Sequence, residues 1–190
     1  MLLLVGLGNP GSNYTNTRHN IGFKIIDAIN AHFKLSKQKP KFKGLLTTGN
    51  IDEKKIYAIK PLTFMNNSGT AIKELIDYFK IDARDVIVFH DDMDIDFGKI
   101  KAKFGGSSAG HNGIESIDKF IGKDYSRVRI GIGHPKQKKK VNNHVLEDFK
   151  EDEEEKINEI TENIVKQIPT LIEKKIDLFS SKVNQNLNGI

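Results

Sequence analysis

Three short stretches of the chain hold most of the residues that could do chemistry. Residues 5–22 read VGLGNPGSNYTNTRHNIG, residues 60–69 read KPLTFMNNSG, and HDDMD at 90–94 precedes AGHNG at 109–113. The side chains of interest within them are Asn9, His19, Asn66, Asp91, His111 and Asn112. A histidine, a carboxylate and several amides, in a chain without cysteine, are typical of a site that activates water and forms no covalent intermediate.

His19 is the candidate general base. It lies in TRHN, which we expect to form the first turn of a helix that carries Ile21. Because a helix N-terminus disfavours a cation, the imidazole should stay neutral and accept a proton near neutral pH. A carboxylate at the other ring nitrogen would set the tautomer and stabilise the cation formed during reaction, and Asp91 is the acid we expect there. A structural role for a single histidine stays open at this point.

The glycines at 6, 8 and 11 match G-x-G-x-x-G after an apolar run, a pattern of dinucleotide-binding proteins. However, Pro10 stiffens the loop, and no well-placed acidic residue ends a following second strand. We therefore favour a sharp turn that projects Asn9 from a strand end into a cleft. A nucleotide-dependent oxidoreductase is the alternative enzyme class.

A second motif match is to the G-x-S-x-G of serine esterases, at Gly106, Ser108 and Gly110. That motif needs a buried strand directly before it, whereas the strand expected here is half-exposed. A flexible loop that approaches a ligand closely is the better interpretation.

The acid-rich HDDMDID at 90–96 invites a calcium hypothesis. Read as a calcium loop from Asp92, it places Phe97 at the glycine position and Lys103 at the glutamate position. We reject that loop and predict neither a metal nor a cofactor.

Length and composition indicate one domain spanning residues 1–190. Such a chain can bury a substantial core, and zero cysteine excludes disulfide scaffolds and thiolate zinc sites. The opening MLLLVGL lacks a basic region and is too short for a signal peptide, and no stretch approaches the roughly 18–20 apolar residues of a membrane span. We expect a soluble, cytoplasmic protein without a membrane partner.

The formal net charge of +5 arises from uneven clusters. Lysines gather at 37–43, 99–103 and 136–140, while an acidic block at 147–155 partly hides them in the total. Such clusters suit a polyanionic partner, and solvated surface charge is the alternative. The segment Lys136–Asn143 fits a flexible wall of a cleft.

Apolar periodicity predicts strands that alternate with helices. Strands are expected at 2–7, 43–50, 55–60, 86–90, 99–104 and 127–132. Helices are expected at 21–33, 72–79, 114–121 and from about 151. This order predicts an α/β fold, a single domain with a central, mixed and mostly parallel sheet flanked by helices.

Several local features refine this prediction. Asn67 or Ser68 is available to cap the second helix, and Pro169 should break or kink the last one. In the strand at 99–104, Ile100, Ala102 and Phe104 should face the core, with Lys99, Lys101 and Lys103 on the other face. The polar tail from about 180 to 190 should be loosely held.

Together, these motifs closely resemble the bacterial-type peptidyl-tRNA hydrolase family. The similarity runs in order through VGLGNPG, YTNTRHNIG, PLTFMNNSG, HDDMD, GHNG and RVRIGIGHP, and so covers most of residues 3–149. It implies a monomeric α/β fold and hydrolysis of the ester that joins a peptide to the terminal ribose of tRNA. The implied partner is peptidyl-tRNA, met free in solution or on a stalled large ribosomal subunit.

The resemblance also implies roles for individual residues. His19 would be the general base and Asp91 would stabilise it, while Asn9 would distinguish a peptide-bearing tRNA from a free aminoacyl-tRNA. The residues implied to line the site of the tRNA 3′ end and the peptide are Tyr14, Phe64, Met65, Asn66 and Asn112. Those implied to grip the tRNA backbone are Lys103, His111 and Arg129.

Two positions depart from the family pattern. Glu115 stands where the family usually has a basic residue, and Ala109 stands where glycine is common. Both lie outside the expected chemistry and affect only local tRNA contacts. A non-catalytic RNA-binding protein on the same fold is the remaining alternative, although the presence of both His19 and Asp91 speaks for catalysis.

Overall fold

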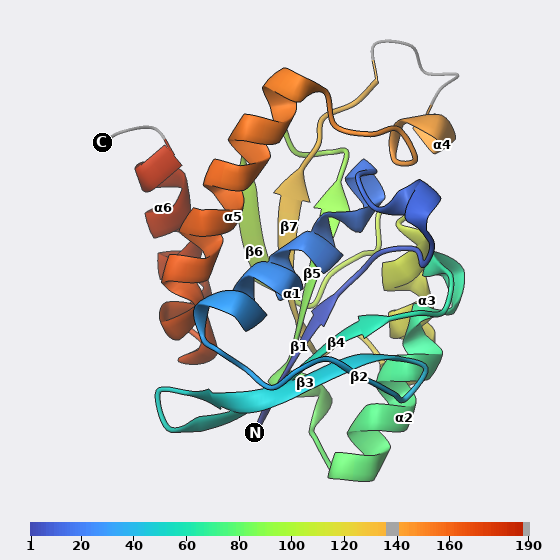
Figure 1. Ribbon diagram of the computed structural model, residues 1–190, viewed down its shortest axis with the longest axis vertical. Helices are drawn as coiled ribbons and strands as arrows, with labels where there is room; N and C mark the ends of the chain where they lie inside the picture. The colour runs from blue at the N-terminus through green and yellow to red at the C-terminus, as the bar shows by residue number, and fades with distance from the viewer. Residues whose placement is uncertain (136–140, 188–190) are drawn as a thin grey trace.

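The chain folds around one seven-stranded sheet with helices on both faces (Figure 1). The computed structural model describes residues 1–135 and 141–187. Its strands are β1 (Leu2–Gly6), β2 (Lys39–Lys41), β3 (Gly44–Ile51), β4 (Lys54–Pro61), β5 (Val86–Asp92), β6 (Ile100–Phe104) and β7 (Ser126–Gly131). Its α-helices are α1 (Ile21–His32), α2 (Ser68–Phe79), α3 (Asn112–Ile121), α4 (Val141–His144), α5 (Glu151–Ile172) and α6 (Ile176–Leu187). Short 3₁₀ turns are η1 (Ser12–Tyr14), η2 (Arg18–Asn20), η3 (Met65–Asn67) and η4 (Ala83–Asp85).

The strand order is β2-β3-β4-β1-β5-β7-β6. The central strands β4, β1, β5 and β7 are parallel, whereas β2, β3 and β6 pair antiparallel toward the two edges. The mixed sheet is confirmed, and its parallel part is confined to the centre. Because the carboxyl ends of parallel strands meet at one edge, the loops after β1, β4 and β5 lie together, and these loops carry the motifs.

Alternate residues of the central strands feed two separate apolar layers. Leu2 and Leu4 of β1 pack with α1, α5 and α6, whereas Leu3 and Val5 pack with α2 and α3. Figure 1 shows these two sets of helices on opposite sides of the sheet. Burial on both faces explains why β1 and β5 read as continuous apolar runs.

Two expectations for the C-terminal region were wrong, namely a break of the helix at Pro169 and a loosely held tail from residue 180. Pro169 lies inside α5, which continues to Ile172, because Ile168 and Leu171 are buried and their packing outweighs the missing hydrogen bond. Residues 180–187 belong to α6, which packs against β6 and buries Phe179 and Val183. Residues 188–190 lie outside the described part of the chain.

Two smaller expectations also changed. Asn67 precedes α2 but its side chain forms no capping hydrogen bond, and the Ser68 hydroxyl instead donates to the Met65 carbonyl. On β6, Ile100 is buried as expected, whereas Phe104 is exposed. The reason is that α6 reaches only the first residues of this edge strand.

Within residues 1–135 and 141–187, no helix is both long and apolar enough to cross a membrane. The flexible wall expected at Lys136–Asn143 falls largely on residues 136–140, which lie outside the described residues.

Candidate active site

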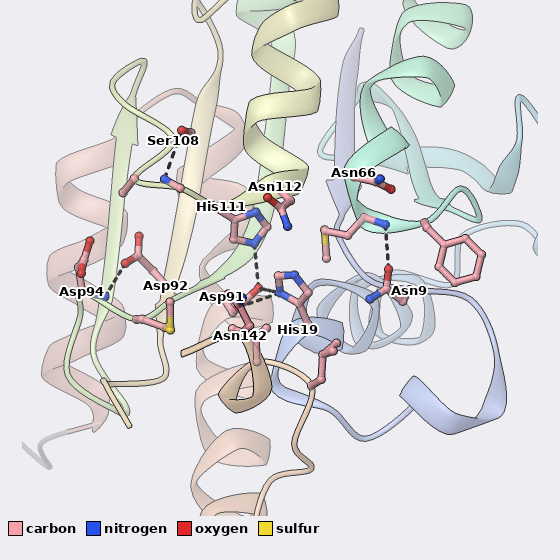
Figure 2. A pocket seen from close by; sticks show the side chains of 17 residues that line it. Asn9, His19, Asn66, Asp91, Asp92, Asp94, Ser108, His111, Asn112 and Asn142 are labelled. Carbon is pink, nitrogen blue, oxygen red and sulfur yellow. Dashed lines mark hydrogen bonds and ion pairs between the residues drawn. The ribbon is translucent and has the colours of Figure 1, made fainter. Parts of the chain in front are cut away.

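A pocket of about 640 Å³ lies at the carboxyl ends of the parallel strands. It is lined by loops after β1, β4 and β5, by the start of α3 and by the segment around α4 (Figure 2). The predicted site residues that line it are Asn9, His19, Phe64, Met65, Asn66, Asp91, His111 and Asn112. Tyr14, Lys103 and Arg129 are absent from this lining set.

His19 is held by its backbone as well as by its side chain. It lies in η2, which runs directly into α1 at Ile21, so the expected first helical turn is a 3₁₀ turn. Its N–H donates to the Val145 carbonyl over 2.8 Å, which ties it to the segment after α4. Only 8% of its side chain is exposed, at the pocket.

Asp91, at the end of β5, lies between two histidines (Figure 2). His19 Nδ1 is 2.8 Å from Asp91 Oδ1 and 2.9 Å from Oδ2. His111 Nε2 is 2.9 Å from the same Oδ1. The predicted pairing of His19 with Asp91 is present in the structure, and His111 joins it.

The partners of His111 define its tautomer. Its Nδ1 accepts hydrogen bonds from the backbone N–H groups of Gly113 (3.1 Å) and Ile114 (3.3 Å), and so caps α3. A nitrogen that accepts carries no proton, so the neutral ring has its proton on Nε2 and donates to Asp91. His19 likewise donates Nδ1–H to the carboxylate, which leaves its Nε2 unprotonated and able to take a proton.

His111 is directed into the protein, and its expected contact with the tRNA backbone stays a prediction. Both of its ring nitrogens have partners inside the protein, and only 10% of its side chain is exposed.

Asp91 also sets the acidity of His19. Burial lowers the pKa of His19, but the charge and hydrogen bond of Asp91 together raise it above its usual value of 6.5. The prediction that a helix N-terminus keeps this ring neutral was therefore wrong in direction. Burial raises the pKa of Asp91, yet His19 and His111 outweigh it and hold that pKa far below its usual range, so the carboxylate is ionised.

The same three side chains are close enough together to be considered as ligands of one metal ion. The ligand atoms of His19, Asp91 and His111 lie within 4.8 Å of one another, which is compatible with a metal ion. A metal would need the lone pair of His111 Nε2, but this nitrogen carries the proton because Nδ1 accepts two N–H groups. The donor set fits a hydrogen-bonded cluster better than a metal site.

Asn9 is fixed in one orientation by two neighbours. Its backbone N–H and C=O pair with the side-chain amide of Asn20 over 2.8 and 2.9 Å. Its Oδ1 accepts the backbone N–H of Met65 over 2.8 Å, so the other end of the amide, Nδ2, must be the NH₂ donor. Asn9 therefore presents a donor to the pocket.

Exposed amides and aromatic rings surround this centre. Asn66 and Asn112 are exposed, and each stands at the start of a helical segment beside the pocket. Phe64 is 57% exposed, and Tyr14 packs edge-on against it with the ring centroids 6.4 Å apart. Tyr14 thus contacts Phe64 and lies outside the set of residues that line the pocket.

The predicted cations lie on one face of β6 and β7. The register places Lys103 opposite Arg127 and Lys101 opposite Arg129. Arg129 Nε donates to Asp92 over 2.7 Å, and Asp92 lines the pocket, so this basic face adjoins the site. Burial and then the neighbouring arginines lower the pKa of Lys103.

Both departures from the family pattern lie near the pocket. Glu115 accepts a hydrogen bond from the Ser108 hydroxyl over 3.4 Å. Ala109 adopts a left-handed backbone with φ of 49°, a conformation that suits glycine.

Sequence reasoning missed two residues of this cluster. Asn20 orients Asn9, and only its position next to His19 gave a signal. His90 donates from Nδ1 to its neighbour's carbonyl, that of Asp91, over 2.7 Å, and its ring packs against His111 at 4.8 Å. Burial, followed by the charge of His111, holds the pKa of His90 well below its usual value, so it is neutral.

Residues 3–189 match the family described as peptidyl-tRNA hydrolase. A peptidyl-tRNA hydrolase of Pelagibacter ubique (strain HTCC1062) is 73% identical over 184 residues, covering 97% of this chain and 99% of that protein. One of Ehrlichia ruminantium (strain Welgevonden) is 48% identical over 181 residues, covering 95% of this chain and 93% of that protein.

Solved structures agree with these relatives. A crystal structure of peptidyl-tRNA hydrolase from Acinetobacter baumannii has a TM-score of 0.90 and 34% identity, and covers 97% of this chain and 94% of that one. The comparisons support neither a non-catalytic RNA-binding protein nor a nucleotide-dependent oxidoreductase. The chain belongs to the peptidyl-tRNA hydrolase family.

Proposed function

We propose that this chain hydrolyses the ester between a peptide and the terminal ribose of tRNA, with His19 as general base and no covalent intermediate. The observation that carries this proposal is the shared carboxylate of Asp91. It holds His19 by Nδ1 and leaves Nε2 unprotonated at the pocket.

The reaction begins when His19 Nε2 takes a proton from water and the resulting hydroxide attacks the ester carbonyl. Asp91 stabilises the imidazolium that forms, and the proton then passes to the departing ribose oxygen. The amides of Asn66 and Asn112 supply donors for the carbonyl oxygen as it gains charge. General-base catalysis contributes roughly 10²- to 10⁴-fold, and one oxyanion donor contributes roughly 10²- to 10³-fold.

Asn9 would select substrates with a blocked amino group. Its Nδ2 donor can bond the carbonyl oxygen of an N-acyl group, which a peptide always has. A free aminoacyl-tRNA presents an ammonium there, which has only donors and leaves Asn9 without a partner.

The remaining contacts hold the tRNA. Phe64, supported by Tyr14, and Met65 offer apolar surface for the 3′ end and the start of the peptide. Lys103 and Arg129 would contact backbone phosphates, since a hydrolase of many peptidyl-tRNAs needs a grip that does not depend on sequence. The enzyme would act in the cytoplasm as a monomer, on substrate released from ribosomes or held on a stalled large subunit.

Hydrolysis of N-acetylated aminoacyl-tRNA beside its unblocked counterpart tests this proposal. We expect the wild type to cleave the blocked substrate at least tenfold faster, because a donor cannot pair with an ammonium. Asn9→Asp keeps an acceptor for the Met65 N–H but replaces the donor with a carboxylate oxygen, so the preference should shrink or reverse. Equal cleavage of both substrates by the wild type, or cleavage of neither, would contradict the proposal.

A further inference from the structure

A buried cation lies behind the loop that leads into α3. Arg127 of β7 is 1% exposed. Its NH2 group donates to Asp118 of α3 over 2.9 Å, and its NH1 group donates to the carbonyl of Ser107 over 2.8 Å. The guanidinium stacks over Tyr125 at 4.8 Å, and the Tyr125 hydroxyl donates to the same Asp118 oxygen over 2.7 Å. The carboxylate of Asp118 thus balances the buried charge of Arg127.

The loop that Arg127 contacts has an unusual backbone. Gly105, Gly106, Ala109 and Gly110 all have positive φ, from 49° to 102°. Such a loop lacks the repeating hydrogen bonds of a helix or strand. Within it, the His111 N–H donates to the Ser108 carbonyl over 3.0 Å, and the N–H groups of Ala109 and Gly110 donate to the hydroxyls of Ser107 and Ser108. The Gly105 N–H holds the start of the loop by donating to the Tyr125 carbonyl over 2.9 Å, and Arg127 holds its middle to the sheet through the Ser107 carbonyl.

The two hydrogen bonds of Arg127 hold the chain on both sides of His111. The Ser107 carbonyl lies four residues before His111, and Asp118 lies seven residues after it in α3. Between these two points stand His111, whose Nε2 is 2.9 Å from Asp91, and Asn112, which lines the pocket. One planar guanidinium with donors in two directions can hold both points at once, whereas a lysine ammonium on a flexible stem cannot reproduce that fork.

We propose that Arg127 is a positioning residue for hydrolysis, which places His111 against Asp91 and Asn112 at the ester by fixing the 105–111 loop and α3. The proposal rests on the function proposed above. Arg127 contacts no substrate, and its effect reaches His19 through His111 and Asp91. The competing view is that the buried ion pair contributes to stability alone.

Single-turnover hydrolysis of N-acetylaminoacyl-tRNA by Arg127→Lys tests the proposal, at saturating enzyme and below the melting transition. We expect the rate to fall at least about tenfold, since a displacement near 1 Å at a reacting centre is costly, while tRNA affinity changes less than about twofold. The pKa of His19, measured by NMR titration, should also rise in this variant, because Asp91 would no longer be shared with His111.

Asp27→Asn is the matched control. Asp27 forms an ion pair with Lys60 over 2.5 Å, and the cation of this pair is also well buried. Neither residue lines the pocket. This substitution should lower thermal stability without changing the rate or the His19 titration. A folded Arg127→Lys enzyme with the wild-type rate and titration would overturn the proposal.

A double-mutant cycle tests whether Arg127 acts through His111. His111→Asn keeps a capping side chain for α3 but lacks the ring that reaches Asp91. If both residues act in one unit, the losses in rate should be far from additive. Additive losses would contradict the proposal that Arg127 acts through His111.

If Arg127→Lys does not fold, Tyr125→Phe serves as a second variant, because it removes one hydrogen bond to Asp118. It should give a smaller loss of rate, and an unchanged rate would contradict the proposal. Failure of the wild type to cleave the substrate would instead count against the proposed function.

Discussion

At the scale of residues, the site depends on which nitrogen of each histidine carries a proton. The sequence allowed His19 to be paired with Asp91, since a base needs a carboxylate behind it. It could not show that His111 shares this carboxylate, because its partners at Nδ1 appear only once α3 is built. Nor could it show that Asp91 outweighs burial in setting the pKa of His19.

The raised pKa of His19 predicts the pH dependence of the reaction. Only the neutral ring can accept a proton, so activity should rise with pH through a pKa above 6.5. Asp91→Asn removes the charge that raises this pKa, so the rising limb should move to lower pH. The plateau should fall by about 10²-fold or more, because the imidazolium loses its partner. Single-turnover rates across pH measure both effects, and an unmoved limb in Asp91→Asn would exclude the pairing as the cause.

At the scale of elements, apolar periodicity located the strands and helices that bury a regular face. Apolar periodicity did not predict the end of α6, because the side chains there that contact β6 are polar. The Asn184 side chain accepts from the N–H of Ile100 over 3.0 Å and donates to its carbonyl over 2.8 Å. The Ser180 hydroxyl accepts the N–H of Ala102 over 2.8 Å. These side chains cover the edge of β6 as another strand would, and in sequence they read as a solvated tail.

Asn184→Ala should therefore destabilise the protein by about 1–2 kcal/mol, because two backbone groups of β6 lose their partners. Asn186→Ala is the control, since Asn186 lies in the same helix and is exposed. Its effect should stay within about 0.5 kcal/mol. Chemical denaturation measures the free energy of unfolding of both variants. Equal values would show that the contacts of Asn184 with β6 contribute nothing measurable.

At the scale of the whole molecule, the fold brings three loops from separate parallel strands to one pocket and sets a basic face beside it. The motifs after β1, β4 and β5 meet because each follows the carboxyl end of a parallel strand. AGHNG instead reaches the pocket through the loop between β6 and α3, because β6 is antiparallel to β7. The motifs could not predict that His111 turns inward while Lys103 and Arg129 stay beside the pocket. That distinction depends on the register of β6 against β7 and on the capping of α3.

The basic face of β6 and β7 predicts that the affinity for tRNA depends on salt concentration. Lys103→Ala or Arg129→Ala should weaken binding of all tRNAs alike and reduce the slope of log affinity against log salt by about 0.7–0.9 per lost contact. Lys73→Ala, on α2, is a control because that lysine pairs with Asp77 and not with the basic face. Titrations at several salt concentrations measure the slope. A loss confined to one tRNA would point to base recognition instead.

The central claim is that His19 activates water, and single-turnover hydrolysis of N-acetylaminoacyl-tRNA by His19→Ala tests it most directly. With enzyme in excess, the rate reports the chemical step apart from binding. We predict a fall of roughly 10²- to 10⁴-fold with nearly unchanged tRNA affinity. A variant that still hydrolyses the ester at close to the wild-type rate would contradict the account.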